Sequence, residues 1–444
     1  MRMQHAGRTV LLALVGGAVA LALGGCRYRQ EAPAVAPPAA SAATPADDAG
    51  GLRLERVVML MRHGVRPPTK PTIGPPGTAD KPWPKWGAGF GELTPHGYDA
   101  VKLLGAWDRE HWETLGLLPR DRCLDKTELE MEASYKSRTR DTARALADGM
   151  MPGCPVSIPH PADVEHDFLF HPLATGKPAY DAAAAIEQAR ARQPQGGMAG
   201  EIHDNAGLFA LLNQALGCCT PATCGDGKAR ACDLSRWPAA LQTGDDGAVS
   251  VGDPFSLAST IGQTFLLEYL EGMPMEDVAW GRVDEAGIGK LLEFHVLKYK
   301  YEARTPYVAL RTAAPLASRM LDALDHGARL TVLAGHDTNI AQLGGFFDLH
   351  WTVPGYPSDD PPPGGAIGFQ LLSDAAGAKY VRAFYRSQTM PQVRELQPLD
   401  ENNPASWEIL PIPGCAEPCR FDSFAALTRG KLAEAGFEAA TPRD

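Results

Sequence analysis

The stretch RVVMLMRHGVRPP, from Arg56 to Pro68, contains a strand and the residues that end it. Residues 56–61 form a short apolar run, which predicts a buried strand. A glycine and two prolines then stop any regular element. The loop carries His63 between Arg62 and Arg66. Open α/β sheets bind ligands at the carboxyl ends of their strands, so this loop is a candidate site.

A second buried strand with a polar end is predicted far downstream. Residues 329–334 read RLTVLA and are followed by Gly335, His336 and Asp337. His336 can donate a hydrogen bond to an anion, and Asp337 can deliver a proton to a leaving group. The structural alternative is that Asp337 only caps the next helix.

Further elements complete an α/β pattern. Thr94 and Pro95 mark a helix start, and Ser137–Met150 has helical spacing with Arg138 in its first turn, where the helix dipole favours an anion. Further strands are predicted at 129–132, 368–372 and 380–385. Between about 180 and 300 strand signals are scarce, and helices are predicted at 182–191, 208–216, 256–270 and 291–301. This pattern indicates a helical insertion in an α/β protein.

The two strand ends together supply the parts that phosphoryl transfer needs: a clamp, a nucleophile and an acid. Arginine grips a phosphoryl group through two oxygens. Two flanking arginines also favour neutral imidazole at His63, and a histidine must be neutral at one nitrogen to attack phosphorus. Each cluster alone has a structural alternative, but their combination favours catalysis.

Composition narrows the classes of function. The chain has 444 residues and a net charge of -11, which argues against a nucleic-acid binder. Residues 1–26 resemble a lipoprotein-type signal peptide that ends in Leu-Gly-Gly-Cys, with Cys26 as the lipidated residue; a plain signal peptide is the alternative. Residues 27–51 are rich in alanine and proline, which is typical of a linker. We expect an exported chain in the periplasm or on the outer membrane.

Eight cysteines remain besides Cys26, and an even number in an exported chain predicts up to four disulfides. Cys123 and Cys154 flank a helical stretch, and Cys415 and Cys419 lie close together. Four more cysteines crowd residues 218–232, where the sequence leaves the pairing open. Zinc is the alternative for that cluster, but its spacing is not a repeated CxxC, so we expect no metal.

The motif Arg62-His63-Gly64-x-Arg66-x-Pro68, paired with a late His336-Asp337, resembles the histidine acid phosphatases, and most of all their bacterial phytases and glucose-1-phosphatases. The resemblance runs from about Leu52 nearly to the C-terminus. It implies an α/β fold with a mixed central sheet flanked by helices, similar to phosphoglycerate mutase, and an inserted all-α domain. The implied domains are 52–178 and 303–444 for the α/β part and 179–302 for the helical part.

The resemblance also implies a role for each matching residue. His63 matches the nucleophile that becomes phosphohistidine, and Asp337 matches the proton donor. The phosphate-binding positions are Arg62, Arg66, Arg138 and His336. The substrate-binding positions are Thr69, Lys70 and Thr338. The family uses no cofactor, and we expect a monomer that acts on a small phosphomonoester.

Some positions depart from the family pattern. Gln263 stands where related enzymes often carry glutamate, Thr260 is also unexpected, and Ser134 replaces an acidic pocket residue. These departures leave the substrate open. Phytate is the leading substrate, with glucose-1-phosphate or broad acid phosphatase activity as alternatives. A catalytically dead phosphate-ester binding protein and a mutase are alternatives of other kinds.

Overall fold

The computed structural model describes residues 51–176, 179–218, 232–244 and 246–437. The predicted signal peptide, Cys26 and the linker up to residue 50 lie outside these ranges. Within them, no helix is both long and apolar enough to cross a membrane.

A six-stranded mixed sheet forms the centre of the molecule, in the order β2-β5-β1-β6-β7-β8. β1, β2 and β5 run parallel to one another, whereas β6, β7 and β8 pair antiparallel. The strand bounds are β1 Arg53–Arg62, β2 Leu129–Ala133, β5 Leu330–Gly335, β6 Ala366–Ser373, β7 Lys379–Ser387 and β8 Ser406–Leu410. The predicted α/β class with a mixed sheet is confirmed.

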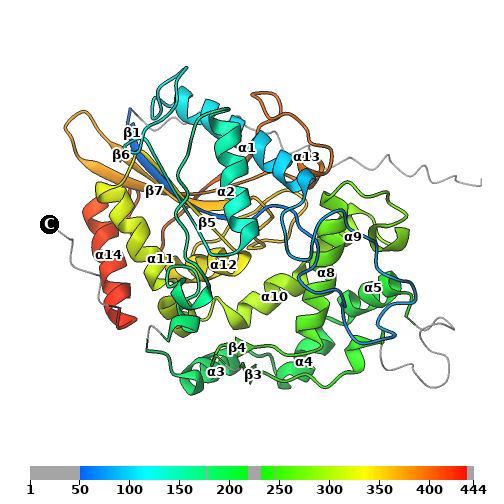
Figure 1. Cartoon of the computed structure of the whole chain (residues 1–444). Coiled ribbons are helices and arrows are strands. Elements are labelled where there is room, and N and C mark those ends of the chain that lie inside the picture. The colour runs from blue at the N-terminus through cyan, green and yellow to red at the C-terminus, as the bar shows by residue number, and fades with distance from the viewer. Residues whose placement is uncertain (1–50, 177–178, 219–231, 245, 438–444) are drawn as a thin grey trace, which may run out of the picture. The chain divides into compact units, whose positions relative to one another are not determined.

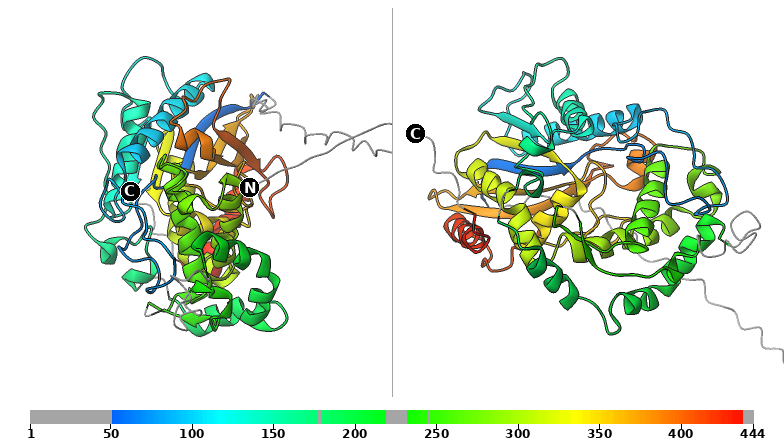
Figure 2. Two further views of the ribbon diagram at one scale, coloured as in Figure 1. Left: turned by 90° about the vertical axis from the view of Figure 1, so that its right-hand side faces the viewer. Right: turned by 60° about the horizontal axis from the view of Figure 1, so that its bottom comes forward.

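Alternate side chains of β1 enter two different cores, because successive residues of a strand face opposite sides of the sheet. Val57, Met59 and Met61 pack with residues of α1 (Pro95–Thr114) and α2 (Ser137–Met150). Val58 and Leu60 belong to the larger cluster on the other face. Residues 57–61 (VVMLM) are all apolar because helices cover both faces of the sheet. Figures 1 and 2 show these helices on either side of the strands.

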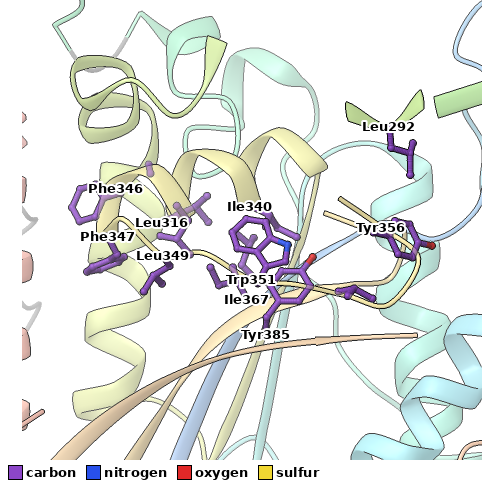
Figure 3. Close-up of a cluster of buried hydrophobic side chains, with 14 of the residues drawn as sticks. Leu292, Leu316, Ile340, Phe346, Phe347, Leu349, Trp351, Tyr356, Ile367 and Tyr385 are labelled. Carbon is purple, nitrogen blue, oxygen red and sulfur yellow. The ribbon is translucent and has the colours of Figure 1, made fainter. Parts of the chain in front are cut away.

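Three helices cover the second face: α11 (Pro306–His326), α12 (Asp337–Phe347) and α14 (Phe421–Glu434). Figure 3 shows part of the core beneath them, where Phe346 and Phe347 of α12 lie near Leu316 of α11. Trp351 stacks on Tyr385 of β7 with ring centroids 4.7 Å apart. Each buried side chain of this size stabilises the fold by roughly 1.5–3 kcal/mol, so α12 is held firmly against the sheet.

Between α2 and α11, the regular elements of the described residues are mostly helices, as the sequence predicts. The strands found there, β3 (Gln242–Thr243) and β4 (Val249–Ser250), have two residues each. The predicted helix at 291–301 is divided, since one helix ends at Leu291 and the next begins at Glu293. The helices are α3 Ala182–Ala191, α4 Gly197–Asp204, α5 Ala206–Leu216, α8 Phe255–Leu270, α9 Glu285–Leu291 and α10 Glu293–Glu302. That residues 179–302 form a separate domain stays a prediction.

The remaining elements are short. The 3-10 helices are η1 Val164–His166, η2 Leu173–Thr175, η4 Leu234–Arg236 and η5 Val278–Gly281. A last short helix, α13, spans Met390–Arg394 and precedes β8.

Three disulfides lie within the described residues. Cys123 pairs with Cys154, the two cysteines that flank α2, and Cys415 pairs with Cys419, which is four residues away in the sequence. In the crowded loop, Cys218 pairs with Cys232. Cys219 and Cys224, the other two cysteines of that loop, lie outside the described residues.

Candidate active site

The carboxyl ends of β1 and β5 bring the two predicted clusters together. The strands are parallel neighbours with Arg62 opposite Gly335, and the backbone N–H of His63 donates to the Gly335 carbonyl at 3.1 Å. The residues that follow, His63 and His336, have ring centroids 5.7 Å apart. Arg138 in the first turn of α2 completes the cluster, with its Nη2 3.4 Å from His336 Nδ1.

The loop after β1 is tightly packed, which explains its glycine. A Cβ atom on Gly64 would lie 2.9 Å from side-chain atoms of both Leu93 and Val101. The Gly64 N–H donates to Thr142 Oγ1 at 3.0 Å. A larger residue would displace the backbone beside His63, so Gly64 holds the histidine in position.

His63 is buried, and its hydrogen bond defines which ring nitrogen carries the proton. Nδ1 lies 2.9 Å from the Gly64 carbonyl oxygen. A carbonyl only accepts, so Nδ1 carries the hydrogen and Nε2 keeps a lone pair. Burial is the largest cause that lowers the pKa of His63 well below its usual value, followed by Arg66, Arg138 and Arg62. From the sequence, the flanking arginines alone are expected to keep His63 neutral. In the folded chain, burial lowers the pKa of His63 more than the arginines do.

Three guanidinium groups surround His63, and each retains an unused donor. The Nε atoms of Arg62, Arg66 and Arg138 are buried and have no hydrogen-bond partner within the described ranges. A buried donor without an acceptor is costly, and a bound anion would satisfy it. Burial, followed by the charge of Arg138, lowers the pKa of Arg66 to about 9, so Arg66 stays cationic at neutral and acid pH. The cluster is therefore suited to hold a phosphate.

Asp337 is the first residue of α12 and has two roles at once. Its Oδ1 accepts the Thr338 N–H at 2.9 Å, although the capping position of α12 is His336 and not Asp337. Its Oδ2 lies 3.0 Å from Arg62 Nη2 and 3.8 Å from His295 Nε2. Burial raises the pKa of Asp337, but Arg62, then His295 and His63, outweigh it and hold the pKa well below the usual value. The Asp337 carboxyl group is therefore ionised.

Arg62 is fully buried and held from three sides. Besides Asp337, it donates to the Pro361 carbonyl at 2.6 Å and to Gln263 Oε1 at 2.8 Å. Gln263, noted above as a departure from the family pattern, therefore positions a predicted phosphate-binding residue. In the described parts of the chain, no group of three or more histidine, cysteine, aspartate or glutamate side chains is arranged to hold a metal ion.

Comparison with known proteins agrees with this geometry. Residues 53–181 match the model of the histidine phosphatase superfamily (branch 2). Phytase AppA of Escherichia coli (strain K12) is 34% identical over 390 residues, which cover 82% of this chain and 88% of that protein. The chain belongs to this superfamily. The resemblance drawn from the RHGxRxP motif and the late His-Asp pair is confirmed.

Other relatives of this histidine phosphatase differ in the activity that their names state. Glucose-1-phosphatase of Salmonella typhimurium is 27% identical and covers 82% of this chain and 88% of its own length. The solved structure of Hafnia alvei phytase in complex with myo-inositol hexakis sulphate is 32% identical, with a TM-score of 0.78. It covers 88% of this chain and 99% of its own length. The family of this chain is therefore established, but its relatives are named for different substrates. The residues that line the cleft are the remaining guide to the substrate.

The cleft of this histidine phosphatase has two cavities that share Arg66, Asp337 and Thr338. The first, of about 350 Å³, is lined by His63, His336, Arg66 and Arg138, but not by Arg62. Beyond them its wall includes Phe170, His171, Tyr180, Asp246, Val249 and Glu302. The second, of about 440 Å³, includes the predicted substrate-binding residues Thr69 and Lys70. It also contains Thr260, Gln263, His295, Lys298 and Tyr299.

Helix α10 contributes residues to the cleft that the sequence does not predict. His295, and one turn later Lys298 and Tyr299, all line the second cavity. His295 Nδ1 lies 2.6 Å from Asp360 Oδ1, which leaves Nε2 near Asp337. The spacing of the three residues is visible in the sequence, but no strand end marks them as part of a site.

Proposed function

We propose that this chain hydrolyses phosphomonoesters in two steps, through a phosphohistidine at His63. One observation carries the proposal: a neutral histidine with a free Nε2 lies among three arginines that each keep a buried, unpartnered Nε–H. Arginine is suited to bind a phosphate at two oxygens, and a histidine with a lone pair is a nucleophile for phosphorus.

In the first step, the Nε2 lone pair attacks phosphorus while the bond to the ester oxygen breaks. Asp337 gives its proton to that oxygen, and the alcohol leaves. In the second step, water attacks the phosphohistidine, the P–N bond breaks, and the electron pair returns to Nε2. The proton lost by water restores Asp337. Arg62, Arg66 and Arg138 neutralise the phosphoryl oxygens throughout.

The ionised Asp337 of the empty site must gain a proton when the substrate binds. A phosphate beside it adds negative charge and competes for Arg62, and both effects raise the pKa of a carboxyl group. Substrate binding therefore takes up a proton, and acid pH favours it. This agrees with the acid phosphatase activity that the family resemblance implies.

Turnover of p-nitrophenyl phosphate in the presence of a chelator tests the proposed activity. We expect release of phosphate that the chelator does not reduce. Binding of the ester without release of p-nitrophenol would instead favour a phosphate-ester binding protein, and a requirement for metal would contradict the histidine mechanism.

We propose phytate as the preferred substrate, and the second cavity supports this. Lys70 and Lys298 both line it, together with hydroxyl groups of Thr69, Ser256 and Thr260. The neighbouring phosphates of a polyphosphate need cations and donors beyond the arginines at His63, and this cavity offers them. Phytases among the relatives agree with this assignment.

Replacing Lys298 with glutamine should lower kcat/KM for phytate by about tenfold, the value of a charge-assisted hydrogen bond of about 1.5 kcal/mol. Glucose-1-phosphate has a single phosphate, so its kcat/KM should change by less than about twofold. The measurement is phosphate release from both esters at pH 5. Lys290→Gln is the matched control, since Lys290 is an exposed lysine of α9. An equal loss on both esters would contradict the role of Lys298.

A sugar monophosphate is the second candidate, and the first cavity favours it. Beyond the arginines, its wall has the uncharged polar residues Tyr180, Thr312 and Gln342 and the carboxylates Asp246 and Glu302. Such a wall repels a second phosphate but accepts the hydroxyl groups of a sugar. A tenfold higher kcat/KM for glucose-1-phosphate than for phytate would favour this candidate.

We also propose export to the periplasm with a lipid anchor on Cys26. The support is the sequence alone, in which an apolar segment ends in Leu-Gly-Gly-Cys and a linker follows. Extraction into a detergent phase should be strong for the wild-type chain and lost for Cys26→Ser, while phosphatase activity stays the same. Recovery of the unaltered chain in the aqueous phase would contradict the anchor.

A further inference from the structure

Asp167 is a fully buried carboxylate that the proposed mechanism does not use. It follows η1 and lies behind His336. Its Oδ2 accepts three hydrogen bonds: from Ser134 Oγ at 2.6 Å, from His171 Nδ1 at 2.9 Å and from the Tyr135 N–H at 3.2 Å. Asp167 therefore connects the end of β2 with a histidine that lines the first cavity.

The hydroxyl group of Ser134 links Asp167 to His336. Its Oγ lies 3.2 Å from His336 Nε2 and has already given its only hydrogen to Asp167. The hydroxyl can therefore only accept from the ring, and Nε2 must carry the hydrogen. Neutral imidazole has one N–H, so Nδ1 keeps a lone pair.

The contact at Nδ1, on the other side of the His336 ring, independently indicates the same tautomer. His336 Nδ1 lies 3.4 Å from Arg138 Nη2, and a guanidinium only donates. The charged or titratable groups that face His336 come from several elements. They are Arg138 of α2, His63 and Arg66 of the loop after β1, His171, and Asp337 of α12. Burial, then Arg138 and His171, lowers the pKa of His336 well below its usual value, so the ring is neutral in the empty site.

We infer that Ser134 and Asp167 are positioning residues that hold His336 as the Nε2–H tautomer, so that the site selects a phosphate that carries a proton. A fully ionised phosphate oxygen would meet the lone pair of Nδ1 and be repelled. A singly protonated phosphate takes the place of Arg138 Nη2 at Nδ1: its P–O–H donates to the lone pair, the proton stays between the two atoms, and Arg138 turns to the other phosphate oxygens. The sequence predicts His336 as a donor, whereas these hydrogen bonds make its Nδ1 an acceptor.

This inference rests on the proposed function, because it concerns the phosphate held beside His63. It also explains how Ser134 can stand where related enzymes carry an acidic residue. The carboxylate is present one step further away, at Asp167, and it acts on His336 through the serine hydroxyl.

Binding of inorganic phosphate between pH 5 and pH 8 tests the inference. Isothermal titration is done in an Asp337→Asn background, so that protonation of Asp337 does not contribute to the pH dependence. With Ser134 present, the Kd should rise by at least about fivefold between pH 6 and pH 8, as phosphate loses its second proton. With Ser134→Ala, the ring can turn its N–H toward phosphate, and the Kd should change by less than about threefold over the same range.

Three controls keep the outcome decisive. Ser134→Thr keeps a hydroxyl and should restore the steep pH dependence, and Ser137→Ala at the start of α2 is the matched loss of a hydroxyl and should leave it unchanged. The thermal unfolding midpoint of each variant reports whether it folds. If Ser134→Ala binds phosphate with the same pH dependence as its parent, the inference is overturned. If the unaltered chain does not turn over p-nitrophenyl phosphate, the proposed function is contradicted instead.

Discussion

Replacement of His63 by alanine is expected to lower kcat on p-nitrophenyl phosphate by at least about 10⁴-fold, because the covalent route is lost. The three arginines remain, so the Kd of inorganic phosphate should change by less than about tenfold. This difference separates a nucleophile from a binding residue. The measurements are steady-state turnover at pH 5 with chelator present, and phosphate binding by titration.

The control for this prediction is His203→Ala. His203 is 90% exposed in its side chain and does not line the cleft, so its loss should leave turnover unchanged. A second readout is mass spectrometry after rapid quenching in base, which should find one phosphoryl group on the wild-type chain and none on His63→Ala. Activity of His63→Ala within tenfold of wild type would reject the histidine as nucleophile.

The second large effect is expected for Asp337→Asn, and it should depend on the leaving group. An alkyl alcohol needs a proton to leave, so kcat on glucose-1-phosphate or phytate should fall by about 10²- to 10⁴-fold. The p-nitrophenolate ion leaves without a proton, so the first-step burst of p-nitrophenol should slow by less than about tenfold. The second step, in which Asp337 takes the proton from water, should slow equally for every ester. Asparagine keeps an oxygen for the Thr338 N–H, so the start of α12 is preserved.

The pH profile provides a further check of Asp337. The pKa of Asp337 is lowered, so the free enzyme loses the protonated carboxyl group already at low pH. Because the proposed mechanism needs that proton, kcat/KM should fall as the pH rises. With substrate bound the pKa is higher, so kcat should begin to fall at a higher pH than kcat/KM. The pKa of His63 lies below 6.5, so the nucleophile stays neutral as pH falls through that value. If kcat of the Asp337→Asn variant still falls as the pH rises, another group must be the proton donor.

The parts of this molecule that the sequence predicts well are those with a local signal. β1 and β5 are apolar runs buried on both faces, and α2 begins and ends at the predicted residues because its buried positions repeat with helical spacing. β8 was missed because it is an edge strand whose residues are mostly half-exposed, so its pattern is weak. The break between α9 and α10 has no proline or glycine to announce it.

The residues of the candidate site also differ in how well the sequence predicts them. His63 and His336 follow strands that the sequence predicts, and parallel pairing then brings them together. Gln263, His295 and Lys298 come from helices that reach the cleft only through tertiary packing, and no local pattern gives that contact. Burial, which contributes most to the neutral His63, is likewise a property of the folded chain.

The pairing of Arg62 with Gly335 has a consequence for folding kinetics. More than half of the chain separates the two strands, and contacts between such distant residues form late because loop closure must come first. His63 and Asp337 therefore cannot meet in a chain that has folded only its first two hundred residues. We expect phosphatase activity to appear only when β5 joins β1, so a chain in which these strands have not paired should be inert toward phosphate esters.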